Sequence, residues 1–511
     1  MKPIGLPIRP PNWITRESPF NRLIWCGLGL ALGLTLVLLP LSSAGLLVVG
    51  AIALLVILIE PLAGLALTLL AGPFGALENV ILGGSSFDSG QLLLLLTLAS
   101  WLAHRVARGR EWAAFWPPHH AGTARLAGLA GLMLVGWGAA TLLWAPSITE
   151  GLQGLAKYGQ IGLVAALAVS EGRRRGGSQA IGAMVLLSGL VQAAIGIWQF
   201  ALRGQGPEHF QILGRFYRAY GTFEQPNPYA GFIGLILPLA AGWWVGRSVA
   251  VGGAVWSRRP GWPWWTVLKL ALLGGAVGLM ACAMLFSWSR GGWLGVGSAL
   301  LAMLLFLPRR PWIGLALAAV LAASGWLTAA SGFLPGSVAQ RLTDFAAYVE
   351  FEDVRGVDVT PENYAVLERM AHWQAAINMA NEHPWTGVGL GNYAVAYAQH
   401  TLLNWPDALG HAHNYYLNAL AETGVPGLAL YLAFWGLVMW HTARLLRWVG
   451  YPQRGMVLGL LGAWVHLSVH SLVDNLYVNN VYLFLGALLG MLVLVHHESA
   501  PAAGPGPARP I

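Results

Sequence analysis

Long runs of apolar residues, separated by short polar segments, dominate the chain between residues 23 and 495. Most runs approach the ~20 residues that an α-helix needs to cross the hydrocarbon core of a bilayer. The pattern predicts fourteen membrane-spanning helices, or twelve if the segment 45–77, interrupted at Glu60-Pro61, is re-entrant. The runs lie near residues 23–41, 45–59, 62–77, 90–104, 127–145, 154–170, 179–200, 229–246, 269–288, 291–307, 312–330, 425–443, 455–473 and 478–495.

The composition supports this interpretation. Of 511 residues, 56% are hydrophobic and only 10% are charged, with a mean hydropathy of +0.59, which is typical of a polytopic membrane protein and excludes an ordinary water-soluble globule. The net charge of +8 does not indicate nucleic-acid binding, because the basic residues lie in short loops between apolar runs. Cys26 and Cys282 lie within apolar runs, so they indicate neither a disulfide framework nor a metal site.

The distribution of basic residues predicts the orientation. With the N-terminus in the cytoplasm, 21 of the 29 lysines and arginines fall on the inner side, as the positive-inside rule requires. An even number of spans then places both termini in the cytoplasm, and we expect a multi-pass membrane protein. Eight basic residues fall on the outer side and need another reason: Lys157, Arg203, Arg215, Arg218, Arg290, Arg341, Arg355 and Arg369.

The same pattern predicts the domain organisation. Residues 1–330 form transmembrane helices with a short outer loop near 203–228, residues 331–424 form a large outer loop domain, residues 425–498 return to transmembrane helices, and residues 499–511 form a Pro/Ala/Gly-rich disordered tail. The outer domain carries ten acidic residues and a net charge near −7, so it is solvated and does not bind polyanions. The fold class is all-α, a helix bundle with a large helical periplasmic loop.

One amphipathic helix is predicted inside the outer domain. Thr360-Pro361 is typical of an N-cap followed by proline at the first helical position, and apolar residues recur at helical spacing from Val366 to Ile377. We expect the helix to end before Pro384 and the glycine-rich stretch Gly387–Asn392 to form a turn.

Two histidines are the leading candidates for chemistry. His411 and His413 directly precede a predicted helix start near Asn414, and His413 leads the face that carries Leu417. A structural role in the protein interior is one interpretation. A general base is the other, because histidine exchanges a proton near neutral pH.

A metal site is a third possibility for this segment. Two histidines two residues apart have the spacing of ligands on an extended chain, and Asp407 or Glu422 could add a ligand. No cysteine or histidine-rich motif nearby completes the set, so we expect no metal. Glu422 stands at a helix end before Gly424, where hydrogen bonding is the commoner role and catalysis the alternative.

Three arginines on the outer side are candidates for binding phosphate. Arg290 occupies the tight connection Ser289–Gly292 between two apolar runs, where it either snorkels to the interface or binds a lipid diphosphate through its bidentate guanidinium. Arg215 and Arg218 are one helical turn apart, so they either form a solvated face or present two guanidiniums together. Asn227, in Pro226-Asn227-Pro228, is typical of a turn and helix start.

Together these motifs resemble the O-antigen ligase and polymerase family of membrane glycosyltransferases. The resemblance covers about residues 210–440 and is most specific in its last two motifs. The motifs occur in the order Gly221-Thr222-Phe223 with Pro226-Asn227, Ser289-Arg290-Gly291, Arg369 with Trp373, His383-Pro384-Trp385-Thr386-Gly387-Val388-Gly389-Leu390-Gly391-Asn392, and His411-Ala412-His413-Asn414 with Leu417, Glu422, Thr423, Gly424 and Gly427.

The resemblance implies an enzyme that needs no metal or other cofactor and transfers a glycan from an undecaprenyl diphosphate donor to a lipid or glycan acceptor at the outer face. It implies that Arg290, with Arg215 or Arg218, contacts the diphosphate, that Arg369 is a weaker candidate for that role, and that His413 is the catalytic histidine. A ligase, as in lipopolysaccharide biosynthesis, and a polymerase both stay open. A lipid-glycan flippase is the rival from another class, although the candidate polar groups gather at one membrane face and not along the midplane.

Overall fold

The computed structural model describes residues 40–82, 88–109, 122–173, 176–256, 264–332, 336, 353–360, 363–402 and 404–499. The predicted first span at 23–41 and the tail beyond Ser499 therefore lie almost entirely outside the described residues. The chain divides into two units, residues 1–60 and residues 61–511. In the first unit, the described structure is helix α3, Leu41–Ile59.

The second unit is almost wholly helical, which confirms the all-α polytopic membrane fold. Its only described strands form a two-residue hairpin, β1 (Gln211–Ile212) with β2 (Phe216–Tyr217). The described residues include the 3-10 turns η1 (Gly72–Phe74), η3 (Glu208–Phe210) and η4 (Val354–Gly356). The α-helices are α4 (Pro61–Ala71), α5 (Gly75–Leu82), α6 (Ser89–Ala107), α7 (Gly122–Thr141), α8 (Ile148–Gly172), α9 (Gly177–Ala201), α10 (Pro226–Trp256), α11 (Trp264–Phe286), α12 (Arg290–Phe306), α13 (Pro311–Ala330), α15 (Tyr364–Glu382), α16 (Tyr393–His400), α17 (Tyr415–Leu445), α18 (Gln453–His470) and α19 (Val481–Ser499).

Nine helical segments among the described residues are long and apolar enough to cross a membrane. They are α4 with α5, then α6, α7, α8, α9, α10, α11, α17 and α19, while shorter apolar helices occupy α3, α12 and α13. Each falls on a predicted apolar run. The run predicted at 455–473 forms α18, which is not among the nine although nearly all of its residues are buried.

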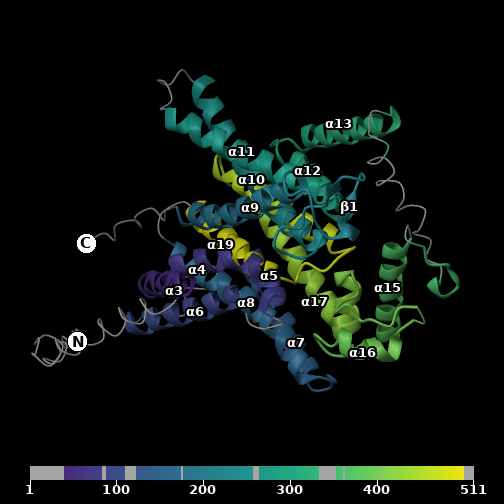
Figure 1. The fold of residues 1–511 in the computed structure, drawn as a ribbon. Helices are drawn as coiled ribbons and strands as arrows, with labels where there is room; N and C mark the ends of the chain where they lie inside the picture. The colour runs from purple at the N-terminus through teal and green to yellow at the C-terminus, as the bar shows by residue number, and fades with distance from the viewer. Residues whose placement is uncertain are drawn as a thin grey trace, which may run out of the picture. The chain divides into compact units, whose positions relative to one another are not determined.

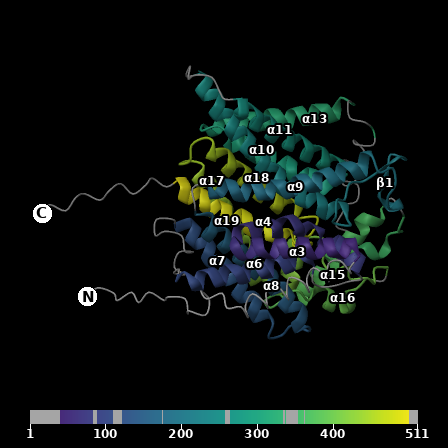
Figure 2. The ribbon, with the colours of Figure 1, turned by 60° about the vertical axis from the view of Figure 1, so that its left-hand side comes forward.

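Helices α10 and α12 lie side by side in the second unit (Figure 1), and the largely buried α18 packs against both (Figure 2). Close approach to α10 depends on glycine: a Cβ on Gly455 would lie 2.3 Å from the carbonyl oxygen of Gly242, and one on Gly459 would lie 2.6 Å from the Cα of Leu239. Small residues at such positions let two membrane helices pack backbone to backbone. The histidines at the end of α18 are thereby fixed relative to α10 and α12.

Two further helix pairs complete the second unit. Helix α19 packs along α8, and α17 packs along α7, where the Trp137 indole donates a hydrogen bond to the carbonyl of Thr423 at 2.8 Å. Helix α17 covers the predicted run 425–443 but starts earlier and bends at Gly424, whose φ of 66° and ψ of −174° are not helical. The predicted break before Val425 is confirmed, and glycine allows it because it lacks a Cβ.

Polar segments converge on one end of the second unit, which we call the site end: the loops 202–225, 287–290 and 471–480, and the described part of 363–414 with its helices α15 and α16. The amide of Ala219 bonds the carbonyl of Phe286, and the amide of Tyr415 bonds that of Ser471. Helices α15 and α16 lie beside the start of α17 (Figure 1). The predicted outer-domain helix is α15, although it begins at Tyr364, because Thr360 and Asn363 bond each other in a turn before it.

Candidate functional site

The histidine loop is held in place by the cap of α17. The side chain of Asn414 accepts hydrogen bonds from the amides of Tyr416 (3.0 Å) and Leu417 (3.1 Å), which confirms the predicted helix start. His413, directly before it, has a φ of 51°, in the left-handed region that residues with a side chain rarely adopt. Strain of this kind persists where surrounding structure enforces it, and it is common at active sites.

His413 faces an acidic residue that the sequence analysis did not select. Its Nδ1 lies 3.8 Å from Oδ1 of Asp474, in the loop between α18 and α19. Neither ring nitrogen of His413 has a hydrogen-bond partner among the described residues. Asp474 is buried, with 4% of its surface exposed. Burial disfavours the Asp474 carboxylate, but the adjacent His413, together with His470 and His411, favours the charged form and holds the pKa of Asp474 well below its usual value.

Two further histidines stay neutral beside His413. His411 Nδ1 accepts the backbone amide of His413 at 3.2 Å, and the two rings lie 4.5 Å apart. Burial, with the proximity of His413, lowers the pKa of His411 to about 4, and the same causes lower the pKa of His372 on α15 to about 4. Of the three histidines His372, His411 and His413, His413 is the one within ion-pair distance of Asp474.

The same residues have the composition of a metal site. Ligand atoms of His411, His413 and Asp474 lie within 4.8 Å of one another. Asp474 is thus the acidic residue of this possible ligand set, a place that the sequence suggested for Asp407 or Glu422. Three ligands with an open position are the set that a catalytic zinc uses, so the metal alternative retains a structural basis.

Arg290 lies at the first position of α12, next to the loop that carries Asp474. Ser289 caps the helix by accepting the amide of Gly292 at 3.3 Å. A Cβ on Gly291 would approach Val473 to 2.7 Å and His470 to 3.0 Å, so only glycine lets the helix start pack against the loop that carries Asp474. Arg369 on α15 lies close enough to His470 for their charges to interact. Arg290 thus starts a helix that packs on the loop carrying Asp474, and Arg369 lies near the histidine four residues before Asp474.

The structure separates Arg218 from Arg215. Arg218 donates to the Ser287 carbonyl at 2.9 Å and to Oδ1 of Asn227 at 3.3 Å, so it joins the connection before Arg290 to the start of α10. Arg215 is exposed and lies over the ring of its neighbour Phe216, 5.3 Å from the centroid. The expectation of a helical pair is wrong, because this segment folds as the β1–β2 hairpin.

Glu422 belongs to a different group of residues from the histidines. Its Oε1 accepts the amide of Tyr393 at 3.3 Å, and its carbonyl accepts the amide of Gly389 at 2.9 Å. These bonds hold the predicted turn Gly387–Asn392, whose three glycines all have positive φ. The hydrogen-bonding role weighed for Glu422 is therefore present in the structure.

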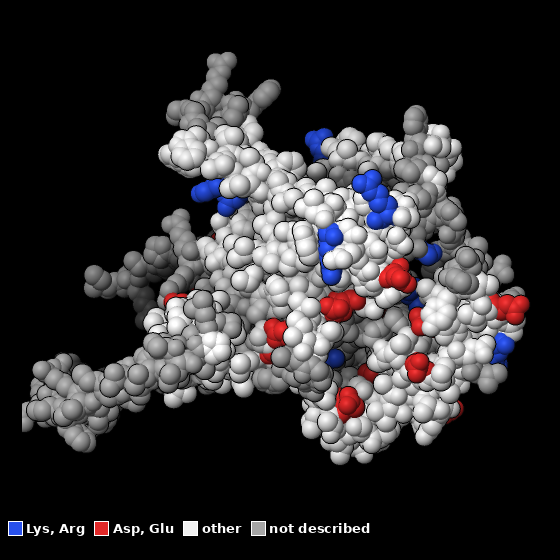
Figure 3. Space-filling model, in the orientation of Figure 1, with Lys and Arg blue, Asp and Glu red and all other residues white. Residues whose placement is uncertain are grey.

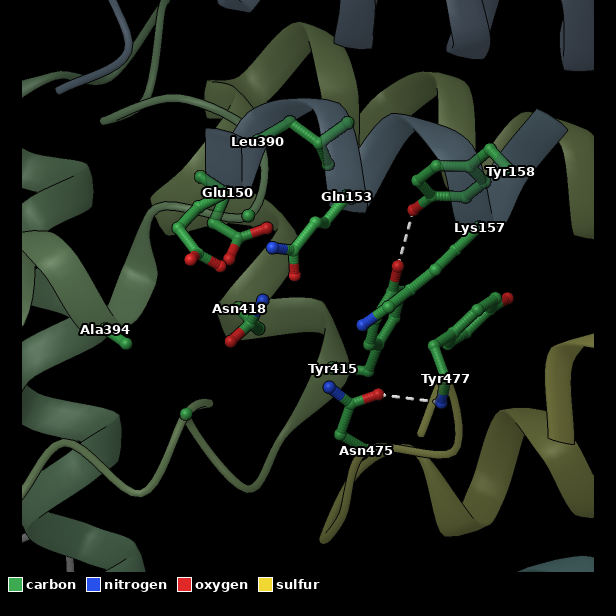
Figure 4. Close-up of a pocket in the computed structure, with 14 residues that line it drawn as sticks. Glu150, Gln153, Lys157, Tyr158, Leu390, Ala394, Tyr415, Asn418, Asn475 and Tyr477 are labelled. Atoms are coloured by element: carbon green, nitrogen blue, oxygen red, sulfur yellow. Dashed lines mark hydrogen bonds between the residues drawn. The ribbon is translucent and has the colours of Figure 1, made fainter. Parts of the chain in front are cut away.

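Glu422 also lines a polar cavity of about 190 Å³ at the site end. Figure 4 shows Lys157 of α8 reaching into it, with Tyr158 and Tyr415 hydrogen-bonded at its side and Gln153 and Asn418 opposite. Figure 3 shows a hollow on this face of the second unit with acidic side chains around its rim. Lys157 was noted in the sequence only as an exception to the charge rule.

Comparison with known proteins supports the family predicted from these motifs. Residues 275–432 match the family model described as O-antigen ligase, which confirms the predicted resemblance. The matched segment contains Arg290, Arg369, both loop histidines and Glu422. The family indicates a membrane glycosyltransferase of the ligase or polymerase kind. No curated protein matches the chain.

Asp474 and Lys157 are the residues that sequence reasoning did not assign. Asp474 is a carboxylate in a short connection between two apolar runs, and a charge in such a place is a signal in itself because charges near a bilayer need a partner. Asp474 follows His470 by four residues and lies 4.0 Å from its Nε2, but no spacing along the chain pairs Asp474 with His413 or Lys157 with Glu422. Their partners became visible only in the folded structure.

Proposed function

We propose that the protein transfers a glycan from a polyprenyl diphosphate, of the undecaprenyl type, to an acceptor hydroxyl at the outer face of a bacterial inner membrane. The observation that carries the proposal is the His413–Asp474 pair, whose loop packs against the start of α12 at Arg290 and follows His470, the neighbour of Arg369. Arg218 bonds the connection before Arg290. A group able to take a proton and guanidiniums suited to a diphosphate leaving group therefore lie on adjoining elements.

The reaction is a single displacement. His413 takes the proton of the acceptor hydroxyl as its oxygen bonds to the anomeric carbon, while the bond from that carbon to the diphosphate oxygen breaks. The configuration at the anomeric carbon is therefore inverted. Asp474 stabilises the imidazolium that forms, and the arginines stabilise the negative charge that develops on the leaving diphosphate.

The outer location rests on the distribution of charge along the chain. The short loops at the opposite end of the helices carry most of the basic residues, which favours a cytoplasmic position for that end and for both termini. The site end is then periplasmic, where a lipid-linked glycan can meet its acceptor without entering the cell.

The direct test is transfer by the purified protein. Protein in nanodiscs is mixed with a labelled glycan on undecaprenyl diphosphate and with candidate acceptors, and products are separated by size. We expect a larger labelled product and release of undecaprenyl diphosphate. Growth of the donor glycan without added acceptor would identify a polymerase, and movement of donor across a liposome membrane without any new product would support the flippase alternative.

A further inference from the structure

A row of three polar residues leads from the interior of the helix bundle to the site end. His466 and His470 are four residues apart on α18, so they share one face of that helix, and they are 0% and 1% exposed. The turn after α18 brings Asp474 within 4.0 Å of His470. The proposed reaction gives a role to Asp474 and none to the two buried histidines.

Glycines of two neighbouring helices make room for the two imidazoles. A Cβ on Gly234 of α10 would lie 2.0 Å from Cε1 of His466, and one on Gly295 of α12 would lie 2.6 Å from Nδ1 of the same ring. A Cβ on Gly291 would lie 3.0 Å from Cδ2 of His470. Helices α10 and α12 therefore close directly on the rings, and their packing fixes the orientation of both. Ionisable side chains inside a membrane bundle are costly and commonly serve a function.

The contacts of the two histidines indicate where their protons lie. Nε2 of His466 lies 3.2 Å from the carbonyl oxygen of Gly231, which can only accept, so this nitrogen carries a proton and donates it. Nδ1 of His470 lies 3.5 Å from the same nitrogen and is therefore an acceptor. Because a neutral imidazole has one N–H group, that of His470 is on Nε2. This is the nitrogen that faces Asp474.

The two oxygens of the Asp474 carboxylate have different neighbours. Oδ2 lies 4.0 Å from Nε2 of His470. Oδ1 accepts the amide of Asn475 at 2.8 Å and lies 3.8 Å from Nδ1 of His413. An N–H group directed at Oδ2 favours the rotamer in which Oδ1 faces His413, because it attracts the negative charge on Oδ2. His470 and His413 thus lie on opposite sides of one buried carboxylate.

We propose that His470 is a positioning residue for Asp474, and that His466 fixes the tautomer of His470 for that task. The inference rests on the proposed function and extends its machinery from the site end into α18. The carboxylate that His470 holds keeps the proton of neutral His413 on Nδ1, which leaves Nε2 of His413 to take the proton of the acceptor hydroxyl. His470 itself neither contacts the substrates nor exchanges a proton in the reaction.

Substitutions at His470 separate positioning from packing. His470→Leu fills a similar space without a donor, whereas the amide of His470→Gln can donate from a position close to that of Nε2. We expect kcat to fall about ten-fold in His470→Leu and to stay within about two-fold in His470→Gln, with the donor KM changed less than about two-fold in both. His441→Leu is the matched control, because it also removes a buried histidine but lies near the other end of α17, where His441 bonds Thr123.

A double substitution tests whether His470 acts through Asp474. If it does, His470→Leu added to Asp474→Asn should lower kcat no further, because the carboxylate that it positions is already absent. Expression and thermal unfolding are matched to the unmodified protein, and His470→Met, with its adaptable side chain, is used if the leucine variant does not fold. Multiplicative losses in the double variant, full kcat in the folded His470→Leu protein, or equal losses in His470→Leu and His470→Gln would each overturn the proposal.

The tautomer of His413 provides a measurement that does not need transfer. Solid-state NMR of protein labelled with 15N-histidine distinguishes protonated from bare ring nitrogens at about pH 8.5, where histidine side chains are ordinarily neutral. The spectrum of His413→Gln assigns the resonances. We expect a proton on Nδ1 of His413 in the unmodified protein and in His470→Gln, and a mixture of tautomers in His470→Leu. The same tautomer in all three proteins would contradict the proposal. If this pattern is found but the unmodified protein transfers no glycan, the proposed function fails while the positioning of Asp474 by His470 stands.

Discussion

His413 Nδ1 and Asp474 Oδ1 lie 3.8 Å apart, although the two residues belong to different loops, one before α17 and the other after α18. This pairing, and not the spacing of the two loop histidines, distinguishes His413 from His411. It also places a carboxylate beside the imidazole that takes the proton in the proposed reaction.

His413→Ala should lower turnover about 10²- to 10⁴-fold, the contribution typical of a positioned general base, while donor binding changes little because the arginines remain. His411→Ala should have a smaller effect. The measurement is kcat and donor KM for the purified variants, with expression level and thermal unfolding matched to the unmodified protein. Near-full turnover in a folded His413→Ala protein, or a larger loss in His411→Ala, would show that the base lies elsewhere, with Glu422 tested next.

Asp474→Asn should lower kcat about ten-fold or more and leave the donor KM nearly unchanged, because asparagine fills the same space but does not stabilise an imidazolium. The measurement is kcat and donor KM for variants matched in expression and thermal unfolding. A kcat equal to that of the unmodified protein would mean that Asp474 has no part in the transfer step.

Arg290→Ala and Arg218→Ala should each weaken use of the donor by about ten- to a hundred-fold, because a hydrogen bond to a charged group contributes about 1.5–3 kcal/mol. Arg215→Ala is the matched control, since that guanidinium lies exposed on its own Phe216. Initial rates over a range of donor concentrations provide the measurement, and Arg290→Lys should restore only part of the loss. If Arg290→Ala leaves donor kinetics unaltered, Arg290 is an interfacial snorkelling residue.

Folding stability should fall as the pH is lowered from about 6.5 towards 4. In the folded protein the pKa values of His411 and His372 are about 4, whereas histidine in an unfolded chain titrates near 6.5. In that window the unfolded chain binds more protons than the folded one, so protons favour unfolding. The apparent Tm in nanodiscs should drop between pH 7 and pH 5, and the drop should be smaller in His411→Gln and His372→Gln. His383→Gln, at an exposed position, is the control, and an unchanged drop in both test variants would contradict the prediction.

Transfer should survive treatment with EDTA, because three arginines can neutralise the diphosphate and Asp474 has a role as the partner of His413. The measurement is the transfer rate after dialysis against the chelator. Loss of activity that one added metal restores would instead make His411, His413 and Asp474 its ligands.

The sequence by itself determined the helical membrane fold, the cap at Asn414, the bend at Gly424 and the choice of Arg290 and His413 as candidates. These features depend on hydropathy over one helix length or on backbone preferences over a few neighbouring residues, so local sequence carries them. The candidate roles themselves stay predictions for the experiments above.

Only the tertiary structure decided which polar groups meet. It paired His413 with Asp474, brought Arg218 to Asn227 and Ser287 while leaving Arg215 exposed, and enclosed Lys157 with Glu422. The physical reason is that these contacts join different helices and loops, and their geometry is set by how the helices pack. Residue spacing along one segment carries no information about which distant segment will lie opposite it.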